Sequence, residues 1–348
     1  MTGMARNLEL SRRRLLAGGL AALAAPALPA WAQLPSLPER DDLVGRLTTY
    51  VSHADETLLA IARAHNVGVP QVSALNPGVD PWVPGDGTKL ALPTWHIIPD
   101  VPREGLIVNK ADLRLYYFPK AGPMQHYAIG VGKEGFNTPI GPTRIVRKRY
   151  KPTWIPTAAS INEKPWLPRV VPAGPDNPLG DYAMDFGFPG SYLVHSTNKP
   201  YGVGRRVSHG CIRMYPEGME RLFPQVALGS RAMVIDQAVK VGWHQGELYL
   251  QVMPSMTQID ELEATAKMSP EPPPPGVEQM VVAKAGTDLG RIDWDTVAET
   301  ARARLGIPVQ VTRGLPALVG SLDQGIAGPA APAAATRPAQ TVNIHGIY

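Results

Sequence analysis

The chain contains 348 residues, of which 44% are hydrophobic, and its formal net charge is +4. Residues 1–32 hold four arginines and one glutamate, which account for +3 of that charge, so the rest of the chain carries only +1. This near-neutral remainder argues against nucleic acid as a partner, and the length of the chain predicts two or more domains.

Residues 1–32 have the features of an export signal. A basic segment ending in Arg12-Arg13-Arg14 precedes an apolar stretch, and Ala30-Trp31-Ala32 offers a cleavage site with the small-x-small pattern. The apolar stretch is short for a membrane span and is interrupted by prolines. We therefore predict export with removal of this segment. An uncleaved anchor is the alternative, and twin-arginine and ordinary secretion both remain open as the route.

Residues 48–93 predict a small α+β unit with the order strand, helix, helix, strand. The preceding residues 33–47 are polar and contain prolines, which predicts a linker. The expected elements are a strand at residues 49–51, a helix capped by Asp55 or Thr57, a second helix at residues 71–75 and a strand at residues 89–93.

Residues 104–236 are expected to form a mainly β unit, either a sandwich or a barrel. Short stretches of strand character follow one another, separated by Gly, Pro and Asn turns, and helical periodicity is weak. Residues 150–185 interrupt them as a long, proline-rich loop that we expect to form a lid or wall over a cleft. The expected strands are residues 106–108, 113–117, 127–131, 143–146, 192–195 and 232–235.

Residues 237–325 are a C-terminal extension of unknown role that is expected to form a small α/β segment. The Ala/Pro-rich residues 326–348 predict a disordered tail. Within the extension we expect strand character at residues 237–253, a stiff spacer at residues 272–275, a strand at residues 280–282, a helix at residues 293–305 and a strand at residues 309–311.

Cys211 is the only cysteine in the chain, so no disulfide can form within it. An unperturbed thiol is mostly protonated at neutral pH, and a catalytic thiol therefore needs a base or a positive field nearby. His209 lies two residues before Cys211, and His195 lies sixteen residues before it at the end of a predicted strand. Because side chains two apart on an extended backbone point the same way, His209 is expected beside the thiol.

Two neighbours of Cys211 also fit a reaction at a carbonyl group. Gly210 lacks a Cβ and lets an oxyanion approach backbone N–H groups, and Arg213 can bind a substrate carboxylate with two parallel hydrogen bonds. The chain has neither a His-Glu-x-x-His motif nor a cysteine pair, so we expect no metal site and no cofactor.

Residues 195–214, HSTNKPYGVGRRVSHGCIRM, resemble the active-site signature of L,D-transpeptidases of the YkuD or ErfK/YbiS/YcfS/YnhG type. That signature is a histidine, a spacer, and then Ser/Thr-His-Gly-Cys followed by an apolar residue and Arg or Asn. Residues 137–143 match the upstream Thr-Pro-x-Gly segment of the same family. Residues 48–93 resemble a LysM module, a family that binds the N-acetylglucosamine-containing glycan of cell walls.

The resemblance implies a periplasmic enzyme of peptidoglycan. Its cysteine would attack the third residue of a tetrapeptide stem, release D-Ala, and pass the acyl group to an amine of another stem or of an outer-membrane lipoprotein. Stem peptides and glycan strands would be its partners. The implied catalytic residues are Cys211, His195 as base and acid, Ser196 or a neighbouring carbonyl to orient it, and His209 and Gly210; Arg213, Ser208, Thr138 and Tyr192 are the implied substrate-binding residues.

Two other functions remain open from the sequence. The acyl-enzyme could pass its acyl group to water, which would make the protein an amidase that releases lipoprotein. Alternatively, the protein could bind the cell wall without catalysis, with Cys211 inert.

Overall fold

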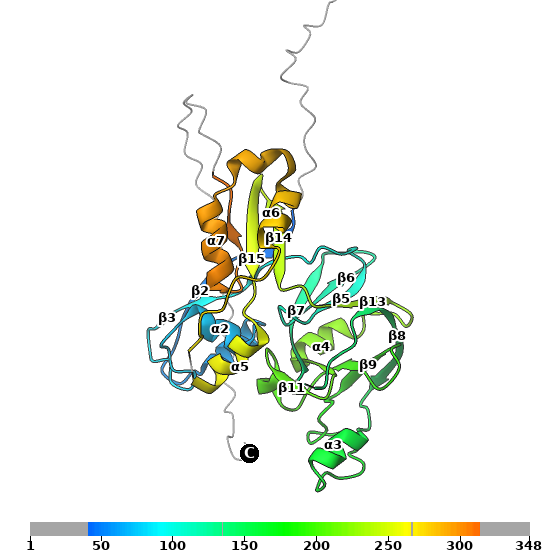
Figure 1. Ribbon diagram of the computed structural model, residues 1–348. Helices are drawn as coiled ribbons and strands as arrows, with labels where there is room; N and C mark the ends of the chain where they lie inside the picture. Colours follow the sequence, from blue (N-terminus) through cyan, green and yellow to red (C-terminus); the bar gives the residue numbers. More distant parts are fainter. Residues whose placement is uncertain (1–40, 134, 266, 314–348) are drawn as a thin grey trace, which may run out of the picture.

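The computed structural model describes residues 41–313, except residues 134 and 266. The predicted export signal and the predicted tail at residues 326–348 lie outside the described residues. Figure 1 shows three groups of elements in contact: an N-terminal unit in blue, a cyan-to-green β unit, and a yellow-to-orange sheet with helices. No helix in residues 41–313, apart from the two positions left out, is long and apolar enough to cross a bilayer.

The N-terminal elements follow the predicted order. Thr57 caps α1 by accepting a hydrogen bond from the Ala60 backbone N–H at 3.1 Å. Apolar side chains from both helices and β3 form a separate small core. The elements are β2 (Thr48–Val51), α1 (Leu58–Ala64), α2 (Val69–Leu75) and β3 (Lys89–Leu92), and the two strands pair antiparallel.

Part of the predicted linker at residues 33–47 is a strand, and this prediction was wrong there. β1 (Leu43–Gly45) pairs antiparallel with β4 (Trp95–Ile97). The Asp42 backbone N–H also donates to the Trp243 carbonyl at 2.7 Å. Three residues give no local strand signal, so the pairing depends on partners far away in the sequence.

Eight strands between residues 105 and 235 form one sheet that closes into a barrel, because the two strands at its ends also pair with each other. β11 (Arg206–Ser208) pairs with β7 outside this ring. Helix α4 (Pro216–Leu222) adds buried side chains to the barrel core. The ring contains, in spatial order, β7 (Gln125–Gly132), β12 (Ile212–Met214), β10 (Leu193–His195), β9 (Tyr182–Phe186), β8 (Gly141–Tyr150), β13 (Arg231–Ile235), β5 (Gly105–Asn109) and β6 (Arg114–Phe118).

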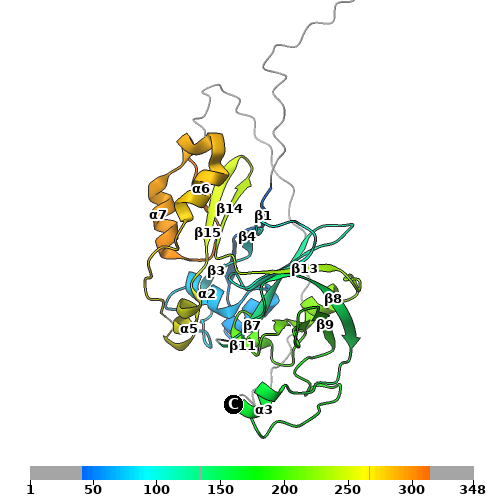
Figure 2. The ribbon, with the colours of Figure 1, turned by 45° about the vertical axis from the view of Figure 1, so that its right-hand side comes forward.

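The predicted loop at residues 150–185 contains regular structure that the sequence did not reveal. β9 lies between β8 and β10, and four of its five residues are buried, so it lacks the alternation that marks a half-exposed strand. Helix α3 (Ala158–Glu163) lies in the same segment. In Figures 1 and 2 α3 projects away from the barrel on the side of β8 and β9.

The C-terminal elements form a separate sheet covered by helices. The strand predicted at residues 280–282 is wrong, because these residues lie in α6. Val277, Val281 and Ala285 are spaced by four, so they form one apolar stripe of the helix, and this stripe packs on the sheet. The free energy gained from this packing outweighs the β propensity of valine. The elements are β14 (Val239–His244), β15 (Glu247–Val252), α5 (Met256–Thr265), α6 (Val277–Ala285), the 3-10 helix η3 (Gly286–Arg291), α7 (Trp294–Ala303) and β16 (Val309–Gln310).

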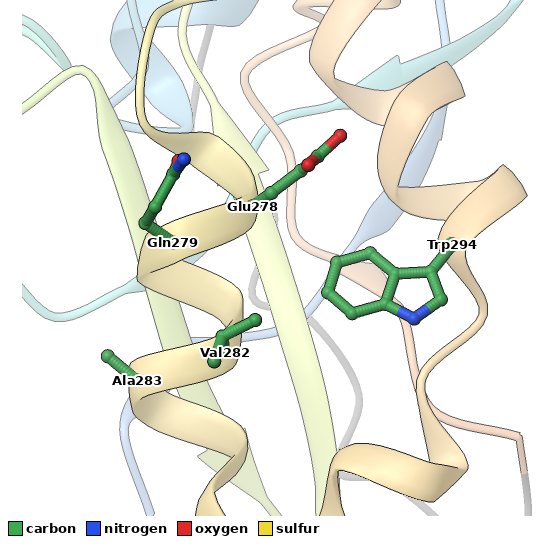
Figure 3. Close-up of a pocket in the computed structure, with 5 residues that line it drawn as sticks. All are labelled: Glu278, Gln279, Val282, Ala283 and Trp294. Atoms are coloured by element: carbon green, nitrogen blue, oxygen red, sulfur yellow. The ribbon is translucent and has the colours of Figure 1, made fainter.

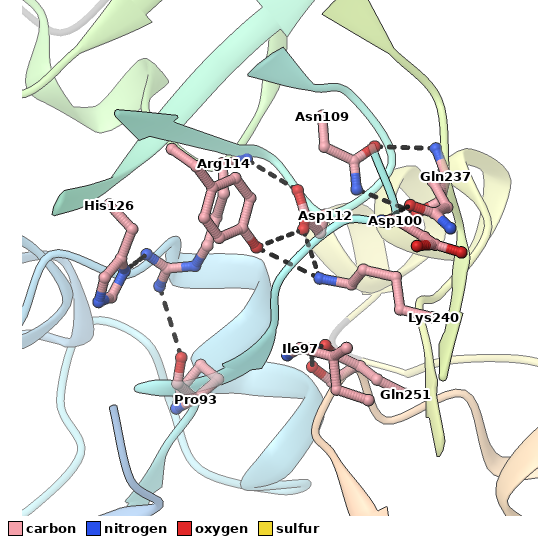
Figure 4. Close-up of polar contacts among 12 residues, drawn as sticks. Pro93, Ile97, Asp100, Asn109, Asp112, Arg114, His126, Gln237, Lys240 and Gln251 are labelled. Atoms are coloured by element: carbon pink, nitrogen blue, oxygen red, sulfur yellow. Dashed lines mark hydrogen bonds and ion pairs between the residues drawn. The ribbon is translucent and has the colours of Figure 1, made fainter. Parts of the chain in front are cut away.

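A buried polar network joins the three groups of elements (Figure 4). Lys240 of β14 forms an ion pair with Asp112 of the β5–β6 turn, with 2.6 Å between Nζ and Oδ2, and both side chains are completely buried. Tyr116 donates to the same carboxylate at 2.7 Å. The Arg114 guanidinium donates to the Asn66 carbonyl, which follows α1, at 3.2 Å. The barrel is therefore bonded to both neighbouring units through the buried side chains of Lys240 and Arg114.

Candidate active site

The predicted histidine ends one barrel strand, and the predicted cysteine directly precedes the neighbouring strand. β10 and β12 run parallel, with Val194 opposite Ile212 and His195 opposite Arg213. Val194 and Ile212 are part of the barrel core, so their alternating neighbours His195 and Arg213 lie on the outer face. Cys211 comes directly before β12, two residues from Arg213. It therefore lies on the same face, diagonally across from His195.

The thiol of Cys211 is partly covered and packs beside Leu179, Ala183 and Leu193. It donates to the Ser191 carbonyl, with 3.6 Å between Sγ and the oxygen. Burial raises the pKa of the Cys211 thiol, and a hydrogen bond from the Leu193 backbone and the charge of Arg213 oppose this effect without cancelling it. The thiol is therefore protonated at neutral pH and needs a base in order to attack.

His195 is held in the state that such a base requires. Its Nδ1 is hydrogen-bonded to the Ser196 carbonyl, which can only accept, so Nδ1 carries the hydrogen. Burial, together with the positive charge of Arg213, lowers the pKa of His195 to about 3. The imidazole is therefore neutral at pH 7, and Nε2 is free of hydrogen and can take a proton. The Ser196 hydroxyl instead donates to the Leu179 carbonyl at 3.1 Å, so the backbone of Ser196 orients the ring.

Two hydroxyl groups hold the turn that carries the cysteine. Ser208 donates to the Cys211 carbonyl at 2.6 Å and accepts from the Gly210 N–H at 3.2 Å. Thr138 donates to the Gly210 carbonyl at 2.8 Å. Gly210 has φ of +100°, and an added Cβ would lie 2.8 Å from a ring carbon of Tyr192. In this structure Ser208, Thr138 and Tyr192 all contact the turn itself.

The second predicted histidine is oriented toward a different partner. His209 Nε2 lies 2.7 Å from Oε2 of Glu163 on α3, and the edge of its ring packs on Phe136 with 4.4 Å between ring centroids. The expectation that His209 lies beside the thiol assumed an extended backbone. The left-handed conformation of Gly210 breaks that alternation.

Arg213 is a largely buried cation beside the thiol and the imidazole. Burial lowers the pKa of its guanidinium. Among residues 41–313, leaving aside 134 and 266, it has no hydrogen bond or ion pair, and its Nε is buried without a partner. The guanidinium lies against Gly202, where an added Cβ would be 2.9 Å from one of its terminal nitrogens. An unpaired, partly desolvated guanidinium is suited to binding a carboxylate.

A charged pair near Cys211 and His195 could not be predicted from the sequence. Asp185 of β9 is opposite Leu193, and it forms an ion pair with Arg149 of β8 at 2.7 Å. Arg149 also contributes to the lowered pKa of His195. The alternation of residues along β8 indicates that Arg149 lies on one face of a strand. Only the order of the strands in the barrel shows that this face is near the thiol.

Of two clefts in the structure, one adjoins the predicted site residues and the other does not. One of about 650 Å³ adjoins the end of β10 and is lined by Gly180, Ser196, Thr197 and Asn198, among others. The other, of about 550 Å³, lies between α6 and α7 and contains none of the predicted site residues (Figure 3). Within the described ranges no group of three or more His, Cys, Asp or Glu residues is placed to hold a metal ion.

Comparison with known proteins adds independent information. Residues 103–235 match the family model YkuD, described as the L,D-transpeptidase catalytic domain. The probable L,D-transpeptidase YcfS of Escherichia coli is 36% identical over 305 residues, which is 84% of this chain and 92% of that protein. The probable L,D-transpeptidase ErfK/SrfK of Salmonella typhimurium is 36% identical over 293 residues, 82% of this chain and 92% of that protein. Both alignments extend beyond the catalytic domain into the flanking segments.

Among solved structures, an L,D-transpeptidase from Mycobacterium smegmatis is 20% identical with a TM-score of 0.29. The match covers 42% of this chain and 63% of that one.

Proposed function

This chain belongs to the L,D-transpeptidase family and is a transpeptidase, and from this premise we propose that it acts in the periplasm on peptidoglycan through an acyl-enzyme on Cys211. The observation that carries the mechanism is the placement of a protonated thiol and a neutral imidazole on the same face of adjacent strands. The family alone gives the reaction class, whereas this geometry supports the roles proposed here for the residues.

The first half-reaction forms a thioester. His195 Nε2 takes the proton from Cys211 as Sγ attacks the carbonyl of the third stem residue. The tetrahedral intermediate then collapses, the C–N bond to D-Ala breaks, and the imidazolium returns its proton to the leaving amine. The proton transfer accompanies the attack, because both groups are neutral at rest.

The second half-reaction transfers the acyl group. An amine attacks the thioester, His195 takes a proton from it, and the restored thiol receives that proton back. The amine comes from a second stem peptide, which gives a 3-3 crosslink, or from a lipoprotein lysine.

Substrate binding is assigned to charged and backbone groups around the thiol. Arg213 binds a carboxylate of the stem, since its guanidinium is unpaired in the described structure. The Cys211 backbone N–H stabilises the oxyanion, since the Gly210 N–H already donates to Ser208 and no Cβ at Gly210 obstructs the approach. The cleft that adjoins Ser196 accommodates the neighbouring part of the stem.

The segment at residues 48–93 is proposed to be a LysM module that holds the glycan strand. Its support is the strand, helix, helix, strand order with antiparallel β2 and β3. The proposed export signal at residues 1–32 would deliver the protein to the periplasm, where both ligands occur.

The test is exchange of D-Ala on purified tetrapeptide stems, comparing wild type with Cys211→Ala. We expect the exchange to disappear in the variant, and unchanged turnover would end the proposal. Mass spectrometry of wall fragments then identifies the acceptor. Crosslinked stems or attached lipoprotein support transfer to an amine, whereas released lipoprotein or free tripeptide indicates an amidase.

A further inference from the structure

The segment between β8 and β9 has a fixed base and a projecting end. At the base, Trp154 and Val171 form an antiparallel bridge, and the buried Asn177 amide donates to the Pro152 carbonyl at 2.7 Å. Residues 155–170, which we call the arm, extend beyond this base and contain α3. Figure 2 shows the arm reaching away from the body of the barrel.

One side chain connects the arm to the barrel. Glu163 Oε2 lies 2.7 Å from His209 Nε2 and 2.6 Å from Lys133 Nζ. Among the residues that the structure describes, these are the only hydrogen bonds or ion pairs between the arm and the barrel. The hydrogen bonds from Lys133 and His209 lower the pKa of Glu163 to about 2, so its carboxylate is ionised at neutral pH.

Both partners of Glu163 belong to the structure that holds the catalytic turn. His209 lies between Ser208 and Gly210 in the chain. The backbone N–H of Lys133 donates to the Ser208 carbonyl at 2.9 Å, and its ammonium group lies 5.2 Å from the centre of the Phe136 ring. Glu163 is therefore connected to the turn twice: through His209, which is part of the turn, and through Lys133, whose backbone is hydrogen-bonded to it.

The arm also exposes large apolar side chains. Ile155 is 68% exposed, Trp166 is 77% exposed and Val170 is 55% exposed. Single exposed apolar residues are common on protein surfaces, but here three lie within one short projecting segment.

We propose that Glu163 is a positioning residue, which fastens the arm to the Ser208–Cys211 turn and orders that turn for acylation. The proposal rests on the proposed function, since it assigns Glu163 a part in forming the acyl-enzyme. Glu163 acts through His209 and Lys133 and not on the reacting atoms. When the carboxylate is neutralised, the arm loses its attachment and the turn loses an external constraint.

The test compares Glu163→Gln and Glu163→Asp with Glu104→Gln as a matched control. Glu104 is also exposed and forms an ion pair, in its case with Arg231, but it lies immediately before β5. Two quantities are measured for each full-length protein: the rate of acylation by a carbapenem, and hydrogen exchange of the arm and of residues 207–211. The exchange measurement does not depend on activity.

We expect Glu163→Gln to slow acylation about two- to fivefold, as loss of an exposed ion pair would. Exchange should become faster in both the arm and the turn, Glu163→Asp should recover part of the effect, and Glu104→Gln should change neither quantity. Unchanged acylation in Glu163→Gln, or faster exchange confined to the arm, overturns the positioning role. Failure of wild type to be acylated would instead refute the proposed function, and exchange in the turn would still decide the role of Glu163.

Discussion

Replacing Asp112 by asparagine should destabilise the protein more than any surface substitution. The carboxylate of Asp112 pairs with Lys240 at 2.6 Å, and both side chains are completely buried. Asparagine preserves the shape but removes the charge, so a buried ammonium group is left without its counterion. Breaking one partner of a buried ion pair typically costs about 3–5 kcal/mol.

A double substitution of the same two residues shows whether the unpaired charge causes the loss of stability. Replacing both residues, Asp112→Asn with Lys240→Met, removes the unpaired cation, and the double variant should recover most of the lost stability. Urea unfolding monitored by circular dichroism measures both effects as changes in the free energy of unfolding. A loss below about 1 kcal/mol in Asp112→Asn would refute the reasoning, since this is the size expected of an exposed pair.

Three further predictions concern the active site and two histidines whose pKa values are lowered. Gly210→Ala should slow acylation at least about tenfold, because a φ of +100° costs an alanine about 1–2 kcal/mol and its Cβ would press on Tyr192. Gly229→Ala is the control, since Gly229 also has a positive φ but has open space around it, and this substitution should not slow acylation. The acylation rate at pH 5 should remain close to that at pH 7, because the pKa of His195 is about 3; a drop of more than about tenfold would indicate an ordinary histidine. The melting temperature should fall from pH 7 to pH 4, because burial lowers the pKa of both His195 and His126 to about 3. Between about pH 6.5 and 3 the unfolded chain binds more protons at these residues, and stability is lost as the pH falls. A flat stability profile across that window would contradict their buried, neutral state.

The residues proposed to react were indicated by a sequence signature, because most of them are close together in the chain. The run from Ser208 to Arg213 is contiguous, and His195 ends a strand whose apolar pattern is readable. A helix was also predicted at residues 293–305, and in the structure Asp293 caps α7 by accepting a hydrogen bond from the Thr296 N–H.

What the sequence did not reveal depends on residues brought together from distant segments. The contact between His209 and Glu163 spans 46 residues of sequence, and the ion pair of Lys240 with Asp112 spans 128. Helix α6 was mistaken for a strand because Val281 and Val282 favour strands locally, whereas packing against β14 and β15 decides the outcome.

The most direct test of the mechanism is the mass of the protein after incubation with a carbapenem at neutral pH, followed by peptide mapping. The account predicts one covalent adduct on the peptide that contains Cys211, formed quickly by wild type and far more slowly by His195→Gln. An adduct that forms at the same rate without the imidazole, or no adduct on Cys211, would contradict the assignment of these two side chains as nucleophile and base.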